Sequence, residues 1–452
     1  MALVKDGRAW VYALFSIVVL ASSLGGLSQT GLNAMLVAVC GDFGIAEGVG
    51  QWLTTAYMLA LGVVVPLSSY LMGRFRLKDL VMLAIGIFAA GSLVAALAAN
   101  FAVLFAARIV QAVATGMMMP LVQTLAMTRF PDGRKATAMG VAGIAMGFAP
   151  NIGPTIGGAM VEGLGWRSFF WLMLGLSLAC LLACWAIVER KEDASYPSGI
   201  DVASFALSAV GFGGLLLGCS EASSVSPTSP LVWAPMLAGI AALAAFVRRQ
   251  RRLEEPFVDM RIFGNGRFSI GFWASCLLFA SYMGITLLVP LYVDGLRGGT
   301  PMEAGLVLLP ATAAALVMNP LAGYLMDRFG VRPIALGAGA CLALGASSMA
   351  FIDASTPLWL VASLQGVRGM GVSGLIGPLT SWSLSELSGK QVGDGSGFGL
   401  AARQASASVG TALMVFCVEG GLLAGEAAFH AAFAVSAAFS VATFAAIVLK
   451  VR

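Results

Sequence analysis

The sequence predicts an all-α protein whose helices cross a membrane many times. Three observations support this fold class: few charged side chains, long apolar runs, and a repeat that relates two distant parts of the chain. Only 11% of the 452 residues are charged, whereas soluble domains contain about 25%. A water-exposed surface needs more polar side chains than this, so the composition excludes a soluble enzyme and a nucleic-acid-binding protein.

The apolar runs have the length of membrane spans. About 20 helical residues cross the roughly 30 Å of hydrocarbon in a bilayer. With charged or Gly/Pro-rich clusters taken as breaks, the sequence predicts fourteen spans. Their approximate limits are 10–39, 50–72, 79–99, 101–126, 135–161, 167–188, 201–220, 231–248, 268–292, 302–325, 333–352, 356–383, 394–418 and 424–449. An even number of spans places both termini on the same side of the membrane.

The distribution of Lys and Arg predicts the orientation. With both termini in the cytoplasm, all but five of the 26 basic residues fall in cytoplasmic segments. Only Arg167 and Arg297 fall in outer segments, and Arg108, Arg368 and Arg403 lie within spans. Because cytoplasmic loops of membrane proteins are enriched in basic residues, this asymmetry predicts cytoplasmic termini.

An internal repeat predicts two related helix bundles. Residues 66–75 (PLSSYLMGRF) match residues 320–329 (PLAGYLMDRF), and the same offset relates Gln111 to Gln365. Parallel repeats of this kind build two bundles around a central site in transporters. The sequence thus predicts a six-helix bundle over 1–195, an inserted helix pair with a cytoplasmic linker over 196–266, and a second six-helix bundle over 267–452.

Several motifs follow one another along the predicted spans. In chain order they are LSQTGLNAML (27–36), QWLTTAY (51–57), LFAARIVQ (104–111), GFAPNIGPTIGG (147–158), GWR (165–167) and DRFGVRP (327–333). With these motifs the chain resembles the major facilitator superfamily, in its fourteen-span drug:proton antiporter branch. Within that branch it is most similar to multidrug and lincomycin-resistance exporters. The resemblance covers nearly the whole chain and implies the major facilitator fold with transport by alternating access.

The chain departs from the family motifs at three places. Gly73 stands where the first-half loop motif has an Asp, and Arg76 replaces its Gly, so only the second-half copy is intact. Ala112 follows Gln111 where Gly is usual, and Ser28 stands where many relatives carry Asp. The carboxylate that the resemblance implies for proton coupling in the first span is therefore absent.

The fifth predicted span carries an unusual set of helix-disturbing residues: Pro150, Gly153, Pro154, Gly157 and Gly158. Glycines clear one face of a helix, so that a neighbouring backbone can approach closely. The two prolines remove backbone hydrogen bonds and permit a bend. One interpretation is plain small-residue packing. The other, which the resemblance favours, is a pliable contact that opens and closes between the two halves.

The intact loop motif contains Asp327, Arg328, Gly330 and Arg332. One interpretation is a solvated loop whose basic residues only orient the span. The resemblance favours an inward gate. In such a gate Asp327 would pair with a basic residue or with the positive N-terminus of a neighbouring helix in one conformation, and release it in the other.

Three arginines lie within spans, where a charge costs roughly 2.5–3.5 kcal/mol on insertion scales. Arg108, Arg368 and Arg403 should therefore face a cavity or a polar partner, either as structural groups or as part of coupling and binding. Arg368 is the best candidate for a substrate contact, because Gln365 lies one turn away on the same helix face. We assign Arg108 and Arg403 to coupling.

No carboxylate is predicted to lie deep in the membrane, although proton antiport normally needs a buried acid. Asp294 and Glu162 are the nearest candidates for coupling, and both fall near the outer ends of spans. The alternative, which their positions favour, is that each is an ordinary loop acid. The shortage of acids also argues against a site for permanently cationic drugs.

The predicted substrate site is mostly apolar with scattered amides, which suits a neutral or amphipathic molecule. Ordinary packing is the alternative for each aromatic residue in it. The candidate substrate-binding residues are Gln29, Asn33, Trp52, Tyr57, Gln111, Asn151, Tyr282, Asn319, Gln365 and Arg368.

The sequence thus predicts a secondary transporter that exports amphipathic small molecules, such as drugs or antibiotics, in exchange for protons. Two alternatives stay open: an exporter of one endogenous metabolite or lipid without proton coupling, and a transport-dead sensor or assembly component. The sequence has no nucleophile–base pair, metal-ligand spacing or phosphate loop, so we expect no enzyme activity, cofactor or metal. We expect a monomer in the cell membrane, in contact with lipid and with its small-molecule substrate.

Overall fold

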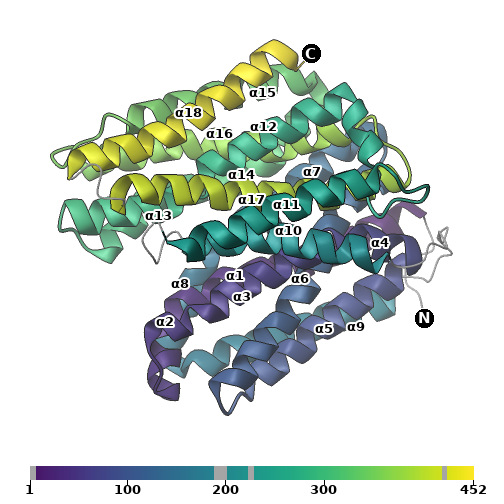
Figure 1. Cartoon of the computed structure of the whole chain (residues 1–452), viewed down its shortest axis with the longest axis horizontal. Coiled ribbons are helices and arrows are strands. Elements are labelled where there is room, and N and C mark those ends of the chain that lie inside the picture. The colour runs from purple at the N-terminus through teal and green to yellow at the C-terminus, as the bar shows by residue number, and fades with distance from the viewer. Residues whose placement is uncertain (1–6, 188–200, 222–228, 420–424, 452) are drawn as a thin grey trace.

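Helices make up all the regular structure in the described part of the chain. The computed structural model describes residues 7–187, 201–221, 229–419 and 425–451. Its helices run side by side along one common direction (Figure 1). The all-α fold class predicted from composition is thereby confirmed.

The first bundle contains the helices up to residue 187. They are α1 (Gly7–Phe43), α2 (Glu47–Gly50), α3 (Trp52–Val64), α4 (Leu67–Arg74), α5 (Leu77–Ala96), α6 (Phe101–Arg129), η1 (Asp132–Arg134), α7 (Lys135–Gly143), η2 (Ile144–Phe148), α8 (Ala149–Leu164) and α9 (Trp166–Ile187). Helix α1 packs on α6, α8 and α9, and α5 packs on α6 and α9.

The second bundle contains the helices from residue 266 onward. They are α12 (Gly266–Tyr282), α13 (Ile285–Pro290), η4 (Leu291–Leu296), α14 (Pro301–Phe329), α15 (Val331–Met349), α16 (Leu358–Leu384), α17 (Lys390–Glu419) and α18 (Glu426–Lys450). Helix α16 packs on α14 and α15, while α12 packs on α17 and α18.

Two further helices lie between the bundles. Helices α10 (Val202–Glu221) and α11 (Pro230–Gln250) pack on each other, and a linker with the short η3 (Met260–Gly264) leads to α12. Helix α10 contacts α3 of the first bundle and α17 of the second. Phe212 of α10 and Phe246 of α11 both contact the ring of Phe398 of α17, with ring centroids 5.7 and 6.4 Å apart. The pair is thereby packed onto the second bundle through aromatic rings.

Length and composition identify fewer spans than the sequence prediction. Among the described residues, 11 helices are long and apolar enough to cross a membrane, or up to 12 if one bent pair counts as a single span. The predicted spans 135–161 and 356–383 are helical but do not meet these criteria. The first is divided into α7, η2 and α8. The second is α16, whose glycines, serines and central Gln365 and Arg368 lower its hydropathy, and most of its C-terminal half is buried inside the protein.

Prolines divide three of the predicted spans. The helices on either side of Pro66 meet at 53°. The π-helical turn η2 ends two residues before Pro150, and a second π-helical turn, η4, directly follows Pro290. Proline removes a backbone donor and crowds the preceding turn, so each break has a local cause in the sequence.

The loop between α14 and α15 is a tight turn that depends on Gly330. This residue has φ +84°, in the left-handed region that strains residues with a Cβ, and it joins the last residue of α14 to the first of α15. The glycine of the loop motif thus has a backbone role.

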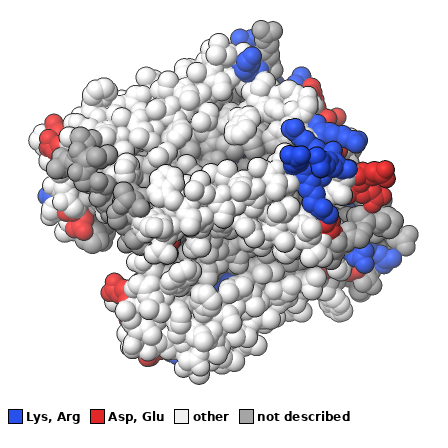
Figure 2. Space-filling model, viewed as in Figure 1, with Lys and Arg blue, Asp and Glu red and all other residues white. Residues whose placement is uncertain are grey.

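One end of the molecule carries most of the exposed basic side chains. Helices α4, α6, α11, α14 and α18 end there with Arg or Lys in their last turns, and α1 begins there. The blue side chains of Figure 2 gather at this end. We call it the basic end, and the other end the opposite end.

Close helix packing predicts a stability effect at Gly410. A Cβ on this residue of α17 would meet the backbone carbonyl of Ala280 in α12. We expect Gly410→Ala to lower the unfolding free energy by about 1–3 kcal/mol, because backbone atoms must move to relieve the overlap. The measurement is thermal unfolding of the purified protein in detergent.

The matched control is Gly175→Ala in α9. Nothing lies within 4 Å of a Cβ placed there, and alanine is the better helix former, so this change should leave stability equal or higher. Equal unfolding temperatures for the two variants would contradict the packing shown by the structure.

Candidate functional site

Arg108 is the centre of a buried polar cluster in the first bundle. Its Nη1 donates to Ser28 Oγ of α1 at 2.7 Å and to Gln111 Oε1 at 3.0 Å. Gln111 Nε2 donates to Ser92 Oγ of α5 at 2.9 Å. The guanidinium carbon lies 4.2 Å from the centre of the Tyr57 ring. The Nε and Nη2 atoms of Arg108 are buried without a hydrogen-bond partner.

Tyr57 fixes the wall of this cluster. Its hydroxyl donates to the carbonyl of Gly25 at 3.0 Å and lies 2.7 Å from Thr115 Oγ1, which links α3 to α1 and α6. Ser28, at the position where an acid was expected, offers Arg108 only a hydroxyl. The cluster therefore solvates the positive charge with dipoles and a ring face.

A second cluster surrounds Arg368 in the second bundle. Its Nε donates to Gln365 Oε1 at 2.9 Å, and its guanidinium carbon lies 5.9 Å from the Tyr282 ring centre. The Nη1 atom is buried without a partner. The structure thus brings together Tyr282, Gln365 and Arg368, three of the predicted substrate-binding residues.

Arg403 connects the two bundles. From α17, its Nη2 donates to Gln123 Oε1 of α6 at 3.2 Å, and its Nη1 donates to Thr380 Oγ1 of α16 at 3.4 Å. Phe279 of α12 lies beneath the guanidinium, 5.7 Å away. The sequence analysis missed Gln123, because nothing local marks an amide that is bonded across the two bundles.

No carboxylate of the described residues forms an ion pair with these three arginines. Their exposed fractions are 0% for Arg108, 1% for Arg368 and 5% for Arg403. A buried charge that lacks a counter-ion favours the approach of negative charge or of strong hydrogen-bond acceptors. The surroundings of these three side chains are thus electropositive.

The glycines of the fifth predicted span pack against α1. A Cβ on Gly157 would meet the carbonyl of Gly31, and one on Gly153 would meet Thr30. Gly158 has more room, with Ala34 Cβ 3.9 Å away. These contacts lie within the first bundle, which differs from the expected contact between the halves.

The prolines of this span account for one hydrogen bond of α1. Pro154 has no N–H to donate to the carbonyl of Pro150, one turn earlier. Thr30 Oγ1 donates to that carbonyl at 2.6 Å instead. The threonine of the first-span motif thus compensates the proline of the fifth-span motif.

One contact between the halves is made by α7 and η2 with α14. Asn319 is buried and donates through Nδ2 to the carbonyl of Gly143 at 3.2 Å. A Cβ on Gly140 would meet the backbone of Asn319, and one on Gly323 would meet the carbonyl of Ala136. Asn319 therefore lies at the junction of the bundles in this conformation.

Asp327 lies at the N-terminus of α7. It accepts hydrogen bonds from the backbone amides of Ala136 at 3.1 Å and Thr137 at 2.7 Å, and from Thr137 Oγ1 at 2.6 Å. The gate hypothesis gave Asp327 two possible partners, a basic residue or a helix N-terminus. In the structure its partner is the N-terminus of α7, where a carboxylate is favoured. Arg328 and Arg332 are exposed at the surface beside it.

A second carboxylate, Asp394, joins three parts of the molecule at the basic end. This side chain of α17 is fully buried, accepts a hydrogen bond from Ser69 Oγ of α4, and accepts the backbone amide of Asp259 in the linker at 2.9 Å. Lys390 Nζ also bonds the linker, at the carbonyl of Pro256, 2.9 Å away. Among the described acids, Asp394 is the only one that is fully buried.

The sequence repeat contains a signal for this contact. At the repeat offset, Asp327 corresponds to Gly73, and the start of α7 corresponds to the start of α17. The first-half loop has Gly73 where the second-half loop has Asp327. The carboxylate that this loop lacks is supplied by Asp394 on the facing helix, α17. The predicted span 394–418 begins at Asp394, but the burial of this side chain depends on partners that are distant in sequence.

The remaining predicted residues do not join these clusters. Asn33 is exposed and accepts a hydrogen bond from Thr54 at 3.0 Å, and Gln29 is half-buried one turn before it. Trp52 is 41% exposed near the opposite end. Asp294 is exposed in η4, so it is not the buried acid that coupling requires. Asn151 belongs to α8, and its side chain lies outside the described residues.

A family model for the major facilitator superfamily matches residues 18–411, most of the chain. The chain belongs to the major facilitator superfamily. It is therefore a multi-pass membrane transporter of small molecules and not an enzyme. The superfamily part of the sequence-based resemblance is confirmed.

Curated bacterial relatives support the same assignment. The chain is 37% identical over 391 residues to the uncharacterized MFS-type transporter YcnB of Bacillus subtilis, covering 86% of this chain and 82% of that protein. It is 32% identical over 402 residues to the lincomycin resistance protein LmrB of Listeria monocytogenes, covering 89% and 85%. It is 30% identical over 402 residues to the multidrug resistance protein B homolog of Mycobacterium tuberculosis, covering 88% and 74%.

Solved structures share the fold at low sequence identity. The human organic anion transporter MFSD10 matches with a TM-score of 0.69 at 14% identity, covering 97% of this chain and 99% of that chain. The Escherichia coli fucose:proton symporter FucP matches with a TM-score of 0.67 at 12% identity, covering 99% and 100%. These matches confirm the major facilitator fold.

Substitution of Asp327 or Asp394 should change hydrogen–deuterium exchange in two different places. In Asp327→Ala the amides of Ala136 and Thr137 lose their acceptor, so peptides covering residues 132–140 should exchange faster, by about 10- to 100-fold. In Asp394→Ala the faster exchange should instead occur around Asp259. Ser69→Ala removes the other partner of Asp394 and should give a weaker effect at the same place.

The control is Asp42→Ala, which breaks an ion pair with Arg167 at the opposite end, where the two side chains lie 2.7 Å apart. Exchange at the basic end should stay unchanged in this variant. The account fails if Asp327→Ala and Asp394→Ala leave their respective peptides at the wild-type rate.

Proposed function

We propose that this secondary transporter exports amphipathic small molecules by alternating access, in exchange for protons. The relatives named as lincomycin and multidrug resistance proteins support placement in the drug:proton antiporter branch. The electropositive surroundings of the three buried arginines support the substrate class: neutral or anionic amphiphiles that offer hydrogen-bond acceptors to the unpartnered guanidinium nitrogens. Permanently cationic molecules would be repelled there.

The observation that carries the proposal is the Arg368 cluster. Gln365 holds one edge of the guanidinium, the Tyr282 ring lies near it, and one nitrogen is left without a partner. Arg108 in α6 and Arg403 in α17 are likewise buried positive charges without a paired carboxylate among the described residues, and we assign them to coupling. Opening of the bundle is needed before a substrate reaches these side chains, because all three are buried in this conformation.

We assign closure of the basic end to two hydrogen-bonded contacts. The first is the bond of Asp327, in α14, to the N-terminus of α7, and the second is the bond of Asp394 to Ser69 and the linker. Each joins parts that must separate if the bundles rock about a central site. Asp394 is also our candidate for proton exchange, since separation of α4 from α17 would expose a carboxylate that is otherwise buried.

Further parts of the proposal concern topology. We propose fourteen spans, a cell-membrane location, and both termini in the cytoplasm, which places the basic end inside. We propose division into residues 1–195, 196–266 and 267–452, although the first boundary lies outside the described residues. We also propose that a single chain is the working unit.

One specific observation favours a second candidate, an exporter of a metabolite or lipid without proton coupling. No described carboxylate pairs with the buried arginines, so proton binding near the substrate has no evident carrier. A transport-dead sensor stays a further alternative without an observation of its own.

Proton coupling can be tested in liposomes that contain the purified protein and an internal pH dye. Under an imposed pH gradient, lincomycin, a neutral amphiphile and an anionic amphiphile are added in turn. We expect proton movement that depends on both protein and compound. Compound movement without proton movement would contradict coupling and favour the uncoupled exporter. Movement of neither would favour the sensor.

A further inference from the structure

Helix α11 presents an apolar face on the outside of the molecule. Its principal neighbour is α10, and the exposed side chains along its length include Leu231, Trp233, Leu237 and Ile240. Large exposed apolar side chains in a membrane protein face lipid. The outer face of α11 is therefore a lipid contact.

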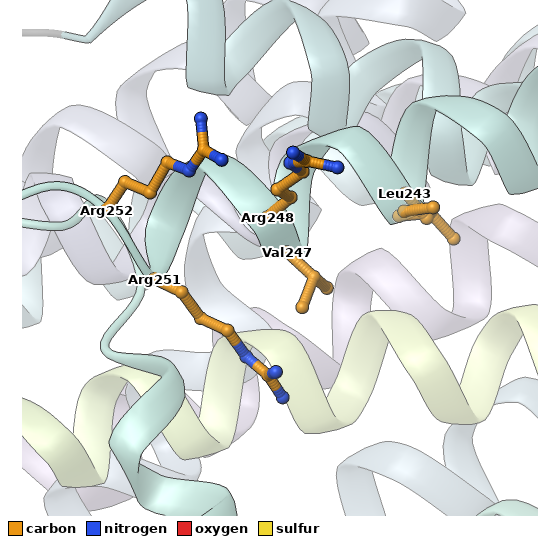
Figure 3. A pocket seen from close by; sticks show the side chains of 6 residues that line it. Leu243, Val247, Arg248, Arg251 and Arg252 are labelled. Atoms are coloured by element: carbon orange, nitrogen blue, oxygen red, sulfur yellow. The ribbon is translucent and has the colours of Figure 1, made fainter.

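This face ends in a groove at the basic end. The groove has a volume of about 620 Å³ and is lined by Leu243, Ala244, Val247, Arg248, Arg251 and Arg252. Figure 3 shows the apolar side chains along the helix and the arginines around its last turn. Apolar side chains thus continue directly into a cluster of positive charge.

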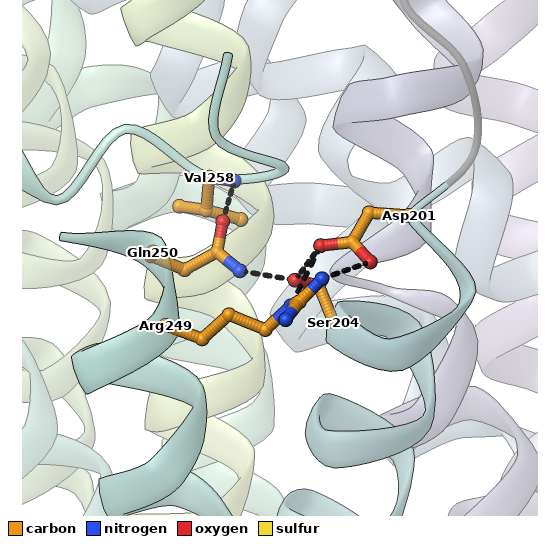
Figure 4. A network of polar contacts seen from close by, with 5 residues as sticks. All are labelled: Asp201, Ser204, Arg249, Gln250 and Val258. Atoms are coloured by element: carbon orange, nitrogen blue, oxygen red, sulfur yellow. Dashed lines mark hydrogen bonds and ion pairs between the residues drawn. The ribbon is translucent and has the colours of Figure 1, made fainter. Parts of the chain in front are cut away.

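A polar network holds this corner in place. Arg249 forms a two-bond ion pair with Asp201, at 2.9 and 3.0 Å, and Gln250 joins Ser204 of α10 to the amide of Val258 in the linker (Figure 4). The polar groups of Arg249 and Gln250 are thereby bonded to other residues of the protein and are not part of the groove.

The three groove arginines have no such partners. Within the described part of the chain, no hydrogen bond or ion pair joins the side chain of Arg248, Arg251 or Arg252 to another residue. Arg267 nearby pairs with Glu386 at 3.0 Å. Glu254 and Glu255 follow in the linker and are exposed, without bonding these arginines. Three guanidinium groups are thus available to an external anion.

We propose that this groove binds one anionic phospholipid of the cytoplasmic leaflet. The headgroup phosphate lies among Arg248, Arg251 and Arg252, and the start of an acyl chain lies along Leu243, Ala244 and Val247. Guanidinium groups match phosphate geometry, and basic pockets on the cytoplasmic side of membrane helices bind acidic headgroups. The bound lipid stabilises the inserted helix pair where it meets the linker. This inference rests on the orientation given under the proposed function.

A general basic surface is the alternative to a built site. Basic residues on the cytoplasmic side attract anionic lipid wherever they lie. A surface effect depends only on the number of charges removed, whereas a built site depends on which charges are removed. The comparison of two triple variants separates these explanations.

The experiment is native mass spectrometry of the full-length protein, delipidated and titrated with phosphatidylglycerol or phosphatidylcholine. The test variant is Arg248→Gln/Arg251→Gln/Arg252→Gln. The control removes three exposed charges of the same end, as Arg74→Gln/Arg261→Gln/Lys450→Gln. We expect phosphatidylglycerol to bind more tightly than phosphatidylcholine, and to bind the test variant about 10- to 100-fold more weakly, with little change in the control.

Two further arms keep the test decisive. Ala244→Trp fills the groove without changing a charge and should also weaken phosphatidylglycerol binding. Excess inorganic phosphate should not displace the lipid. Equal losses in both triple variants, equal binding of the two lipids, or displacement by inorganic phosphate would each overturn the proposal. Lipid binding is measured independently of transport. The lipid proposal can therefore fail while the proposed function holds, and the proposed function can fail while the lipid proposal holds.

Discussion

Three buried guanidinium groups, with no carboxylate of the described residues paired to them, set the main constraint on this structure. Each charge must be solvated by amides, hydroxyls and ring faces, because the surrounding hydrocarbon offers nothing. Ser28, Gln111 and Tyr57 do this for Arg108, and Gln365 does it for Arg368. Helices α6, α16 and α17 therefore carry polar residues on buried faces, and α16 is too polar to count as a span by hydropathy. The same constraint underlies the proposed preference for acceptor-rich substrates.

The basic end contains two contacts of different construction, to which we assign its closure. In one, the loop acid Asp327 reaches the N-terminus of α7, where helix amides are unpaired. In the related position, the loop has Gly73, and Asp394 of the facing helix supplies the carboxylate. The second contact includes the linker of the inserted helix pair. In the proposed mechanism, the pair is thereby connected to the movement that opens the bundles.

Periodic and local features could be predicted from the sequence. Apolar run lengths gave the helix positions, and the spacing of Gln365 and Arg368 placed them on one face. Contacts between distant segments could not be predicted. Tyr57 faces Arg108 because α3 crosses α6, and Gln123 meets Arg403 across the two bundles. The glycines of α8 showed that another backbone approaches, but only the structure identifies it as that of α1.

The charge selectivity of substrate binding tests the central claim most directly. A pair of fluorescent amphiphiles with the same aromatic body, one sulfonated and one carrying a trimethylammonium group, is titrated into wild type, Arg368→Ala and Arg368→Lys. The account predicts that wild type binds the anion and not the cation. It predicts that Arg368→Ala loses about 10- to 100-fold in affinity for the anion, with a smaller loss in Arg368→Lys. Equal binding of both amphiphiles, unchanged by Arg368→Ala, would contradict it.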